Sequence, residues 1–193
     1  MLKKEIIWRE ILFQAIEKKK MQFRQKDLAE KFGFSLSTVF NALKIPRSAG
    51  AIDVKGRFFR VIDIEKFLAI WGANRNFKKE IIYKTHVALP ILKLEAKMPK
   101  SAVYTACSAY RLKFKDAPAD YDKVYVYVKN LKEIKNKFPP QKGYENLIVL
   151  KADNLLKDYG RFPPIAQVYV DLWNLKEWYA HDFLKALKNK ILK

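Results

Sequence analysis

The sequence predicts an α+β protein with an N-terminal domain over residues 1–75 and a small mixed α/β domain over residues 76–193. Two observations predict this class. Residues 1–72 have helical patterns interrupted by one short β-hairpin, whereas strand-like and helical segments alternate after residue 80. Between them lies Ala73–Lys79, which is polar and basic without a long Gly or Pro run. We interpret it as a short joint between the domains.

Residues 25–46 have the pattern of a helix-turn-helix. Gln25–Phe32 predicts a first helix, and Gly33 stands where that helix must end, because glycine enters the left-handed conformation at little cost. Ser35 is placed to cap a second helix. Apolar residues of the second helix follow the i, i+3, i+4, i+7 spacing of one buried face: Leu36, Val39, Phe40 and Leu43. An ordinary helical hairpin of another fold is the alternative interpretation.

The opposite face of this second helix carries short polar side chains and a cation: Ser37, Thr38, Asn41 and Lys44. Such side chains read base edges and hold phosphates. The spacing of Ala29, Gly33 and Val39 also fits the motif, because a small residue lets the two helices approach and an aliphatic residue fills the angle between them. The second helix is therefore predicted to be a DNA recognition helix.

A basic hairpin follows the helix-turn-helix. The β-type segments Ala51–Val54 and Phe58–Asp63 are joined across Lys55-Gly56-Arg57, and Arg60 lies just behind this turn. A cationic tip suits contact with phosphates or with the minor groove.

Helices are predicted on both sides of this region. Lys3–Lys20 is amphipathic, and Ile64–Trp71 resumes helical spacing with Asp63 as its cap. The order helix, helix-turn-helix, hairpin, helix is that of a winged helix-turn-helix domain. We predict this fold for residues 1–75.

The formal net charge of +19 over 193 residues favours a polyanionic partner, most often nucleic acid. The first 75 residues carry 16 Lys and Arg against 8 Asp and Glu, and the remainder carries 23 against 12. Either the second domain also meets DNA or an acidic partner, or the whole chain is simply rich in lysine. No apolar run approaches the ~20 residues that span a bilayer, and the alternating N-terminus is not a secretory signal. We expect a cytoplasmic protein without a membrane partner.

The second domain alternates predicted strands and helices. Strands are expected at 80–85, 123–129 and 146–150, and helices at 90–98, 101–112, 131–138, 153–159, 165–175 and 178–192. Within 101–112, Val103, Tyr104 and Thr105 have strand propensity, which leaves a strand open there. The aromatic residues of Tyr169–Tyr179 could stack on bases, but we interpret them as core. Cys107 is the single cysteine, which excludes a disulfide within the chain, and we expect it to be buried.

Two weak catalytic patterns lie in the second domain. Glu95-Ala96-Lys97 matches half of a metal-dependent nuclease site, and Asp120 and Asp122 form the D-x-D of nucleotidyltransferases. The upstream acid of the first pattern and the Gly-Ser turn of the second are missing, so we interpret both as solvated helix or loop positions. The histidines, His86 and His181, lack ligand spacing. We expect no catalytic residue, no metal site and no cofactor.

The chain resembles the AbiEi-type antitoxin regulators of bacterial and archaeal type IV toxin–antitoxin systems, which combine a winged-helix start with a basic α/β domain. Four segments carry this resemblance: QKDLAEKFGFSLSTVFNALK, IDIEKFLAIWG, SAVYTACSAYRL and IAQVYVDL. The resemblance implies that the N-terminal domain represses its own operon and that the C-terminal domain is linked to antitoxin activity. It also implies a cognate nucleotidyltransferase toxin as partner, although a stand-alone regulator of the same build is equally consistent with it.

Together these patterns predict a non-enzymatic, sequence-specific regulator of transcription that binds double-stranded DNA. Base contacts are expected from Ser37, Thr38 and Asn41, and backbone contacts from Lys44, Arg47, Lys55, Arg57 and Arg60. Two alternatives remain: a nucleic-acid enzyme with a nuclease or nucleotidyltransferase domain, and a non-specific architectural binder.

Overall fold

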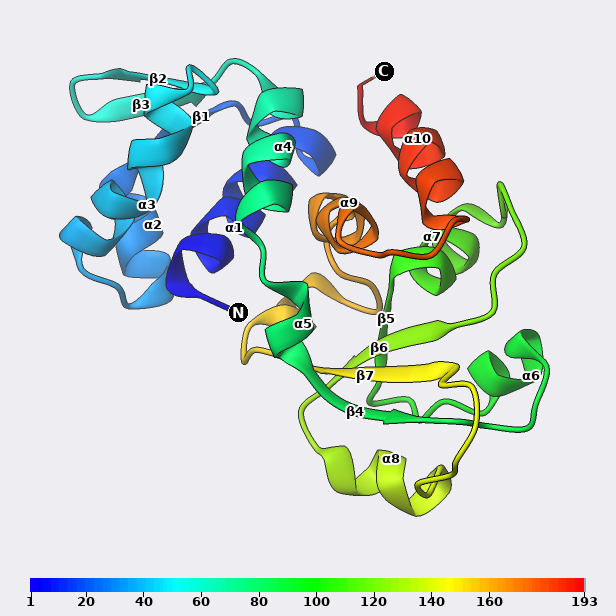
Figure 1. The fold of residues 1–193 in the computed structure, drawn as a ribbon. Coiled ribbons are helices and arrows are strands. Elements are labelled where there is room, and N and C mark those ends of the chain that lie inside the picture. Colours follow the sequence, from blue (N-terminus) through cyan, green and yellow to red (C-terminus); the bar gives the residue numbers. More distant parts are fainter. Residues whose placement is uncertain (193) are drawn as a thin grey trace. The chain divides into compact units, whose positions relative to one another are not determined.

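The computed structural model describes residues 1–192 (Figure 1). The protein is α+β and contains two small sheets of three and four strands, which confirms the predicted class. The chain forms two compact units. Unit 1 comprises Met1–Arg75, Pro164–Val170 and the end of the chain from Asn189, and unit 2 comprises Asn76–Pro163 and Asp171–Lys188. Unit 1 is therefore discontinuous in sequence.

Residues 1–75 of unit 1 form four helices and a three-stranded antiparallel sheet of order β1-β3-β2. Figure 1 shows α2 beside α3, with the β2–β3 hairpin following the end of α3. The elements are α1 (Lys3–Glu17), β1 (Gln22–Arg24), α2 (Gln25–Phe32), α3 (Leu36–Ser48), β2 (Ile52–Lys55), β3 (Phe58–Val61) and α4 (Ile64–Asn74). The strand β1 was not predicted, because three residues are too short to produce a periodic signal.

The predicted helix end and helix caps of unit 1 are confirmed. Gly33 ends α2 in the left-handed region at φ 62°, where residues with a Cβ are disfavoured. Ser35 caps α3 by accepting from the Thr38 amide at 3.2 Å, and Asp63 caps α4 by accepting from the Lys66 amide at 2.8 Å. Because these signals depend only on neighbours in sequence, they could be identified without knowledge of the tertiary structure.

The buried face of α3 differs from the prediction. Val39 and Leu43 are buried, but Leu36 is 55% exposed and Phe40 is 47% exposed. The buried stripe also includes Ala42, whose carbonyl oxygen accepts a 2.7 Å hydrogen bond from the Trp8 indole of α1. Since α1 packs at Ala42, the buried stripe is rotated away from Leu36 and Phe40, and the prediction for these two residues was wrong.

Unit 2 is built on a four-stranded sheet of order β4-β7-β6-β5, in which β6 and β7 are parallel and the outer pairs are antiparallel. Its first elements are α5 (Phe77–Glu80), β4 (Ile81–Thr85), α6 (Ile91–Ala96), β5 (Val103–Thr105) and α7 (Ala106–Phe114). The later elements are β6 (Val124–Val128), α8 (Leu131–Lys137), β7 (Leu147–Lys151) and the 3-10 helix η1 (Leu156–Tyr159). The helices α9 (Ile165–Trp173) and α10 (Ala180–Ile191) are divided between the units: unit 2 contains α9 from Asp171 and α10 up to Lys188.

The sheet of unit 2 is covered on both faces. Figure 1 shows α8 on one face and α7 on the other. All five residues of β6 are consequently buried, although the sequence alternates. Tyr127 of this strand donates a 2.7 Å hydrogen bond to Asp171 of α9, which also accepts one from Thr105 at 2.7 Å.

Three predicted segments of unit 2 need correction. The helix expected over 101–112 begins only at Ala106, because Val103–Thr105 pairs with Tyr125–Tyr127 as an edge strand. The helix expected over 153–159 is reduced to η1. The polar joint expected over 73–79 contains the short helix α5, which is anchored by the buried Phe77.

The segment 164–170 belongs to unit 1 through specific hydrogen bonds. The Ile165 amide donates to Glu17 at 2.8 Å, and Arg9 donates to the side-chain oxygen of Gln167 at 3.1 Å. Arg9 and Gln167 are both fully buried. A buried guanidinium requires such acceptors, so this segment completes the polar interior of unit 1.

A buried carboxylate connects the two ends of the 1–75 segment, which leads to a first prediction. Glu5 accepts from Arg75 at 3.0 Å and from the Trp71 indole at 3.2 Å. Glu5→Ala should destabilise unit 1 by about 3–5 kcal/mol, because it leaves the buried Arg75 guanidinium without its carboxylate. Urea unfolding followed by the fluorescence of the buried Trp8 and Trp71 measures this loss.

Glu30→Ala is the matched control for this experiment. Glu30 forms an exposed pair with Lys26 at 3.6 Å, and exposed pairs contribute less than about 1 kcal/mol. Equal losses for the two variants would show that the Glu5 carboxylate does not stabilise the unit.

Candidate nucleic-acid interface

The exposed face of α3 is polar and basic. Ser37, Asn41 and Lys44 are exposed, Thr38 is half-buried, and Arg47 is exposed in the last turn. The Asn41 side chain is exposed and makes no hydrogen bond within residues 1–192, so both its amide NH₂ and its side-chain oxygen can reach an external group. The structure thus brings these five predicted contact residues onto one helix.

The first turn of α3 carries a cluster of hydroxyl groups. The Ser35 hydroxyl lies 3.0 Å from that of Ser37 and 2.9 Å from that of Thr38. These contacts use the one donor and two acceptor sites of the Ser35 hydroxyl, whereas the Ser37 and Thr38 hydroxyls keep further donor or acceptor capacity. The cluster therefore forms an ordered polar surface at the start of the helix.

Apolar side chains share the exposed surface of α3. Leu36 and Phe40 are joined there by Ile45, which is 41% exposed. The Lys44 ammonium lies 5.5 Å from the centre of the Phe40 ring, close enough for a cation–π interaction. The sequence pattern assigned Leu36 and Phe40 to the core, so their place on this surface was missed.

A cationic hollow lies beside the start of α3. It has a volume of about 450 Å³ and is lined by Arg24, Gln25, Lys26, Leu36, Arg57 and Phe58. The hairpin contributes Arg57, and α2 begins here without a side-chain cap on its free amides. Three cations at an uncapped helix start create a favourable place for an anion.

Arg24 and Lys26 were missed by sequence reasoning. The Arg24 guanidinium lies 4.7 Å from the centre of the Phe58 ring, because β1 and β3 pair with Arg24 opposite Phe58. The signal that could have found these residues is their position next to the predicted start of α2, where backbone amides attract phosphate.

Arg60 and Lys55 lie together in a different hollow. Residue 60 stands opposite Asp53 and Gln22 in the sheet, and the Lys55 ammonium is 3.5 Å from the Asp53 carboxylate. These four residues line a hollow together with Phe58, Phe59 and Ile62, and no residue of α3 lines it. The structure therefore places Arg57 beside the start of α3, whereas it groups Arg60 with an acidic neighbour.

Glu95 of the first catalytic pattern is not on a solvated helix face, and that interpretation was wrong. It is buried in α6, where it pairs with Arg111 and accepts a 2.6 Å hydrogen bond from the Tyr121 hydroxyl. Burial raises the pKa of Tyr121, and its hydrogen bond to Glu95 raises it further. Glu95 is thus committed to internal partners, whereas Lys97 is exposed.

Asp122 of the second pattern is also engaged. It accepts 2.7 Å hydrogen bonds from Tyr144 and from Tyr179. Asp120 and Asp122 are both exposed loop residues, which confirms their interpretation as solvated loop positions. The His86 Nδ1 lies 2.8 Å from the Tyr144 carbonyl oxygen. Within residues 1–192, no group of three or more His, Cys, Asp or Glu side chains is arranged to hold a metal ion.

The remaining single-residue predictions have mixed outcomes. Cys107 is buried as expected, and its burial raises the pKa of the thiol, which keeps it protonated. Tyr169 and Tyr179 are buried as predicted. Trp173 and Trp178 are 43% and 74% exposed, so the core interpretation was wrong for these two residues.

Comparison with protein-family models, with curated proteins and with solved structures gives no match to this chain. None of the helices within residues 1–192 is long and apolar enough to cross a membrane.

The cap of α3 provides a second prediction. Ser35→Ala removes the acceptor of the Thr38 amide and the centre of the hydroxyl cluster. It should lower the free energy of unfolding of unit 1 by about 1 kcal/mol. Ser35→Asp retains an acceptor at the cap and should restore most of this loss. Chemical denaturation of the three proteins measures the effect, and equal stability of Ser35→Ala and wild type would show that the cap is dispensable.

Proposed function

We propose that unit 1 is a winged helix-turn-helix that binds double-stranded DNA, with α3 as the recognition helix and the β2–β3 hairpin as the wing. The observation that supports this most directly is the exposed polar and basic face of α3 next to the cationic hollow at Arg57. Recognition helices enter the major groove with their N-terminal residues toward the bases. The element order from α1 to α4 is the order expected for this fold.

On this proposal, Ser37, Thr38 and Asn41 contact base edges. An amide side chain can pair bidentately with adenine, and hydroxyls can donate to or accept from either strand. The neighbouring Phe40 ring suits apolar contact with a thymine methyl group. A surface that combines these groups favours sequence-specific binding over purely architectural binding, because phosphate contacts alone need none of them.

Phosphates are then held by cations around the reading face. Lys44 and Arg47 extend from α3, and Arg57 shares the hollow with Arg24 and Lys26. Lys55 and Arg60 supply further positive charge on the sheet of the wing. Each neutralised phosphate releases counterions and so adds to the salt dependence of binding.

We further propose that the chain is a non-enzymatic transcriptional repressor of the AbiEi type, with a nucleotidyltransferase toxin as its partner. This part depends on the sequence resemblance alone. The described part of unit 2 does not favour the enzymatic alternative. Both candidate acids already have partners in the protein: Glu95 pairs with Arg111, and Asp122 accepts hydrogen bonds from two tyrosines.

Asn41→Ala is the third prediction. On a site selected from a random duplex library, it should cost roughly 1–3 kcal/mol, because a bidentate amide–adenine pair is lost. Binding to random DNA should change little. Affinities of wild type and variant for both duplexes measure the difference, and equal losses on the two duplexes would remove Asn41 from the reading face.

Arg57→Ala is the fourth prediction. It should weaken binding to the selected site and to random DNA to a similar extent, and it should reduce the salt slope by about one. The measurement is a titration of both duplexes across a salt series. Lys185→Ala, which removes one exposed charge from unit 2, is the control for net charge. A salt slope that stays unchanged in Arg57→Ala would show that the wing does not touch the backbone.

A further inference from the structure

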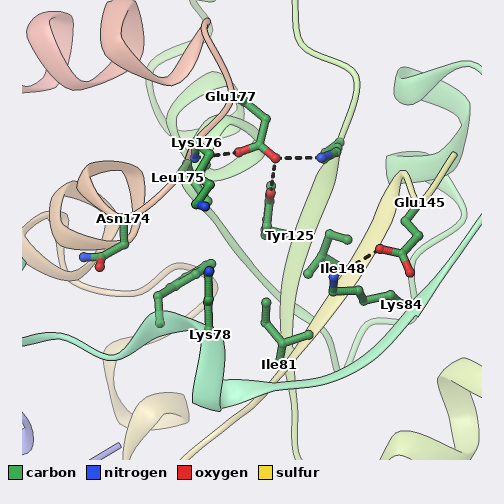
Figure 2. Close-up of a pocket in the computed structure, with 12 residues that line it drawn as sticks. Lys78, Ile81, Lys84, Tyr125, Glu145, Ile148, Asn174, Leu175, Lys176 and Glu177 are labelled. Carbon is green, nitrogen blue, oxygen red and sulfur yellow. Dashed lines mark hydrogen bonds and ion pairs between the residues drawn. The ribbon is translucent and has the colours of Figure 1, made fainter.

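Unit 2 has an open pocket on one face of its sheet (Figure 2). A row of three residues paired in register forms its floor: Lys84 of β4, Ile148 of β7 and Tyr125 of β6. The short helix α5 contributes Phe77 and Lys78 to one wall, and residues 174–177 after α9 form another. The pocket has a volume of about 460 Å³, which is within the range of small-molecule sites. We call it the sheet-face pocket.

The sheet-face pocket combines an apolar interior with a polar rim. Ile81, Ile148 and Leu175 present aliphatic carbons to the space, as Figure 2 shows. Ile148 is buried, whereas Ile81 and Leu175 remain half-exposed although both are apolar. Half-exposed aliphatic surface inside a concave site favours a ligand with an apolar part, and Phe77 and Tyr125 add aromatic rings to the lining, which favours a ring.

Positively charged side chains outnumber negatively charged ones in the sheet-face pocket. Four lysines and two glutamates line it. Lys123 is paired with Glu177 at 2.6 Å, and Lys84 is paired with Glu145 at 3.1 Å. Two lysines are left over, Lys78 and Lys176, and neither has an ion-pair partner among the described residues.

Glu177 is fixed and does not compete for these two lysines. It accepts from Lys123, from the Tyr125 hydroxyl at 3.0 Å and from the Lys176 amide at 3.1 Å. Burial raises the pKa of Glu177, but the hydrogen bond from Lys123 and the other donors outweigh this and lower it. Its charge is therefore neutralised within the wall.

The cations without a partner lie close to the apolar interior. In the view of Figure 2, Lys78 and Lys176 lie on the same side of the pocket, and the Lys84–Glu145 pair lies on the other. Asn174 is on the same side in this view and also lines the pocket. Two ammonium groups beside an aliphatic interior match an anionic group attached to a ring.

We propose that the sheet-face pocket binds a small planar organic anion, an aromatic ring that carries a phosphate or a carboxylate group. The ring lies on Ile81, Ile148 and Leu175, and the anionic group lies between Lys78 and Lys176. This site is independent of DNA binding by unit 1, so either proposal can fail alone.

The test is a titration of the full-length protein by calorimetry and by ligand-observed NMR. Three ring anions are used, adenosine 5′-monophosphate, phenyl phosphate and benzoate, to distinguish a nucleotide from a simpler phosphate or a carboxylate. Adenosine has a ring without the anion, and inorganic phosphate is an anion without the ring. We expect at least one ring anion to bind, and both partial probes to bind about tenfold more weakly or worse.

Two variants locate the binding. Lys78→Ala/Lys176→Ala should weaken the best ring anion by about tenfold or more, because two charge-assisted contacts are lost. Leu175→Trp should weaken it similarly by filling the apolar part. Lys157→Ala/Lys185→Ala removes two exposed lysines of unit 2 outside the pocket and should leave binding unchanged. Circular dichroism establishes that each variant is folded.

Four results would overturn the proposal. One is that none of the three ring anions binds. The second is that inorganic phosphate binds as tightly as they do. The third is that the pocket variants bind a ring anion as well as wild type does, or that the control variant loses as much. The fourth is that Lys78→Ala/Lys176→Ala lowers only the affinity for duplex DNA, which would assign these lysines to a nucleic-acid surface.

Discussion

The buried Glu5 carboxylate ties together parts of unit 1 that are far apart in sequence. It lies in the first turn of α1, and its partners Trp71 and Arg75 follow 66 and 70 residues later. A buried charge is costly unless hydrogen-bond donors or an opposite charge contact it. The first turn of α1 must therefore lie next to the end of α4, where Trp71 and Arg75 can reach the Glu5 carboxylate. With α1 fixed, its Trp8 reaches the Ala42 carbonyl oxygen. The face that α3 leaves exposed is a consequence of that contact.

The parts of unit 1 that the sequence predicts are those decided by neighbours in the chain. Gly33, Ser35 and Asp63 each act within four residues of their own position. The burial of Leu36 and Phe40 was mispredicted because two stripes of α3 have the right spacing and only the position of α1 selects one of them. The edge strand Val103–Thr105 likewise depends on pairing with β6, which lies some twenty residues further along the chain.

The same distinction applies to the candidate interface. Helical spacing alone places Ser37, Asn41 and Lys44 on one face of a helix. By contrast, Arg24 and Lys26 approach Arg57 only because β1 pairs with β3 across more than thirty residues of chain. Local composition does not single them out, because they are two of many basic residues, and only their position beside the start of α2 does.

The net charge of +19 is the observation that first indicates a polyanionic partner, yet its distribution carries more information than its size. Many cations are neutralised locally, as Lys123 is by Glu177 and Lys84 by Glu145. What distinguishes the hollow at Arg57 and the sheet-face pocket is that cations gather in each without an equal number of acids. In the first they surround an uncapped helix start, which suits a phosphate of a long polymer. In the second they border the aliphatic carbons of Ile81, Ile148 and Leu175, which suit a small ligand that carries its own apolar surface. The two places therefore differ in the kind of anion that can satisfy them, which argues against a uniformly lysine-rich surface as the whole explanation of the charge.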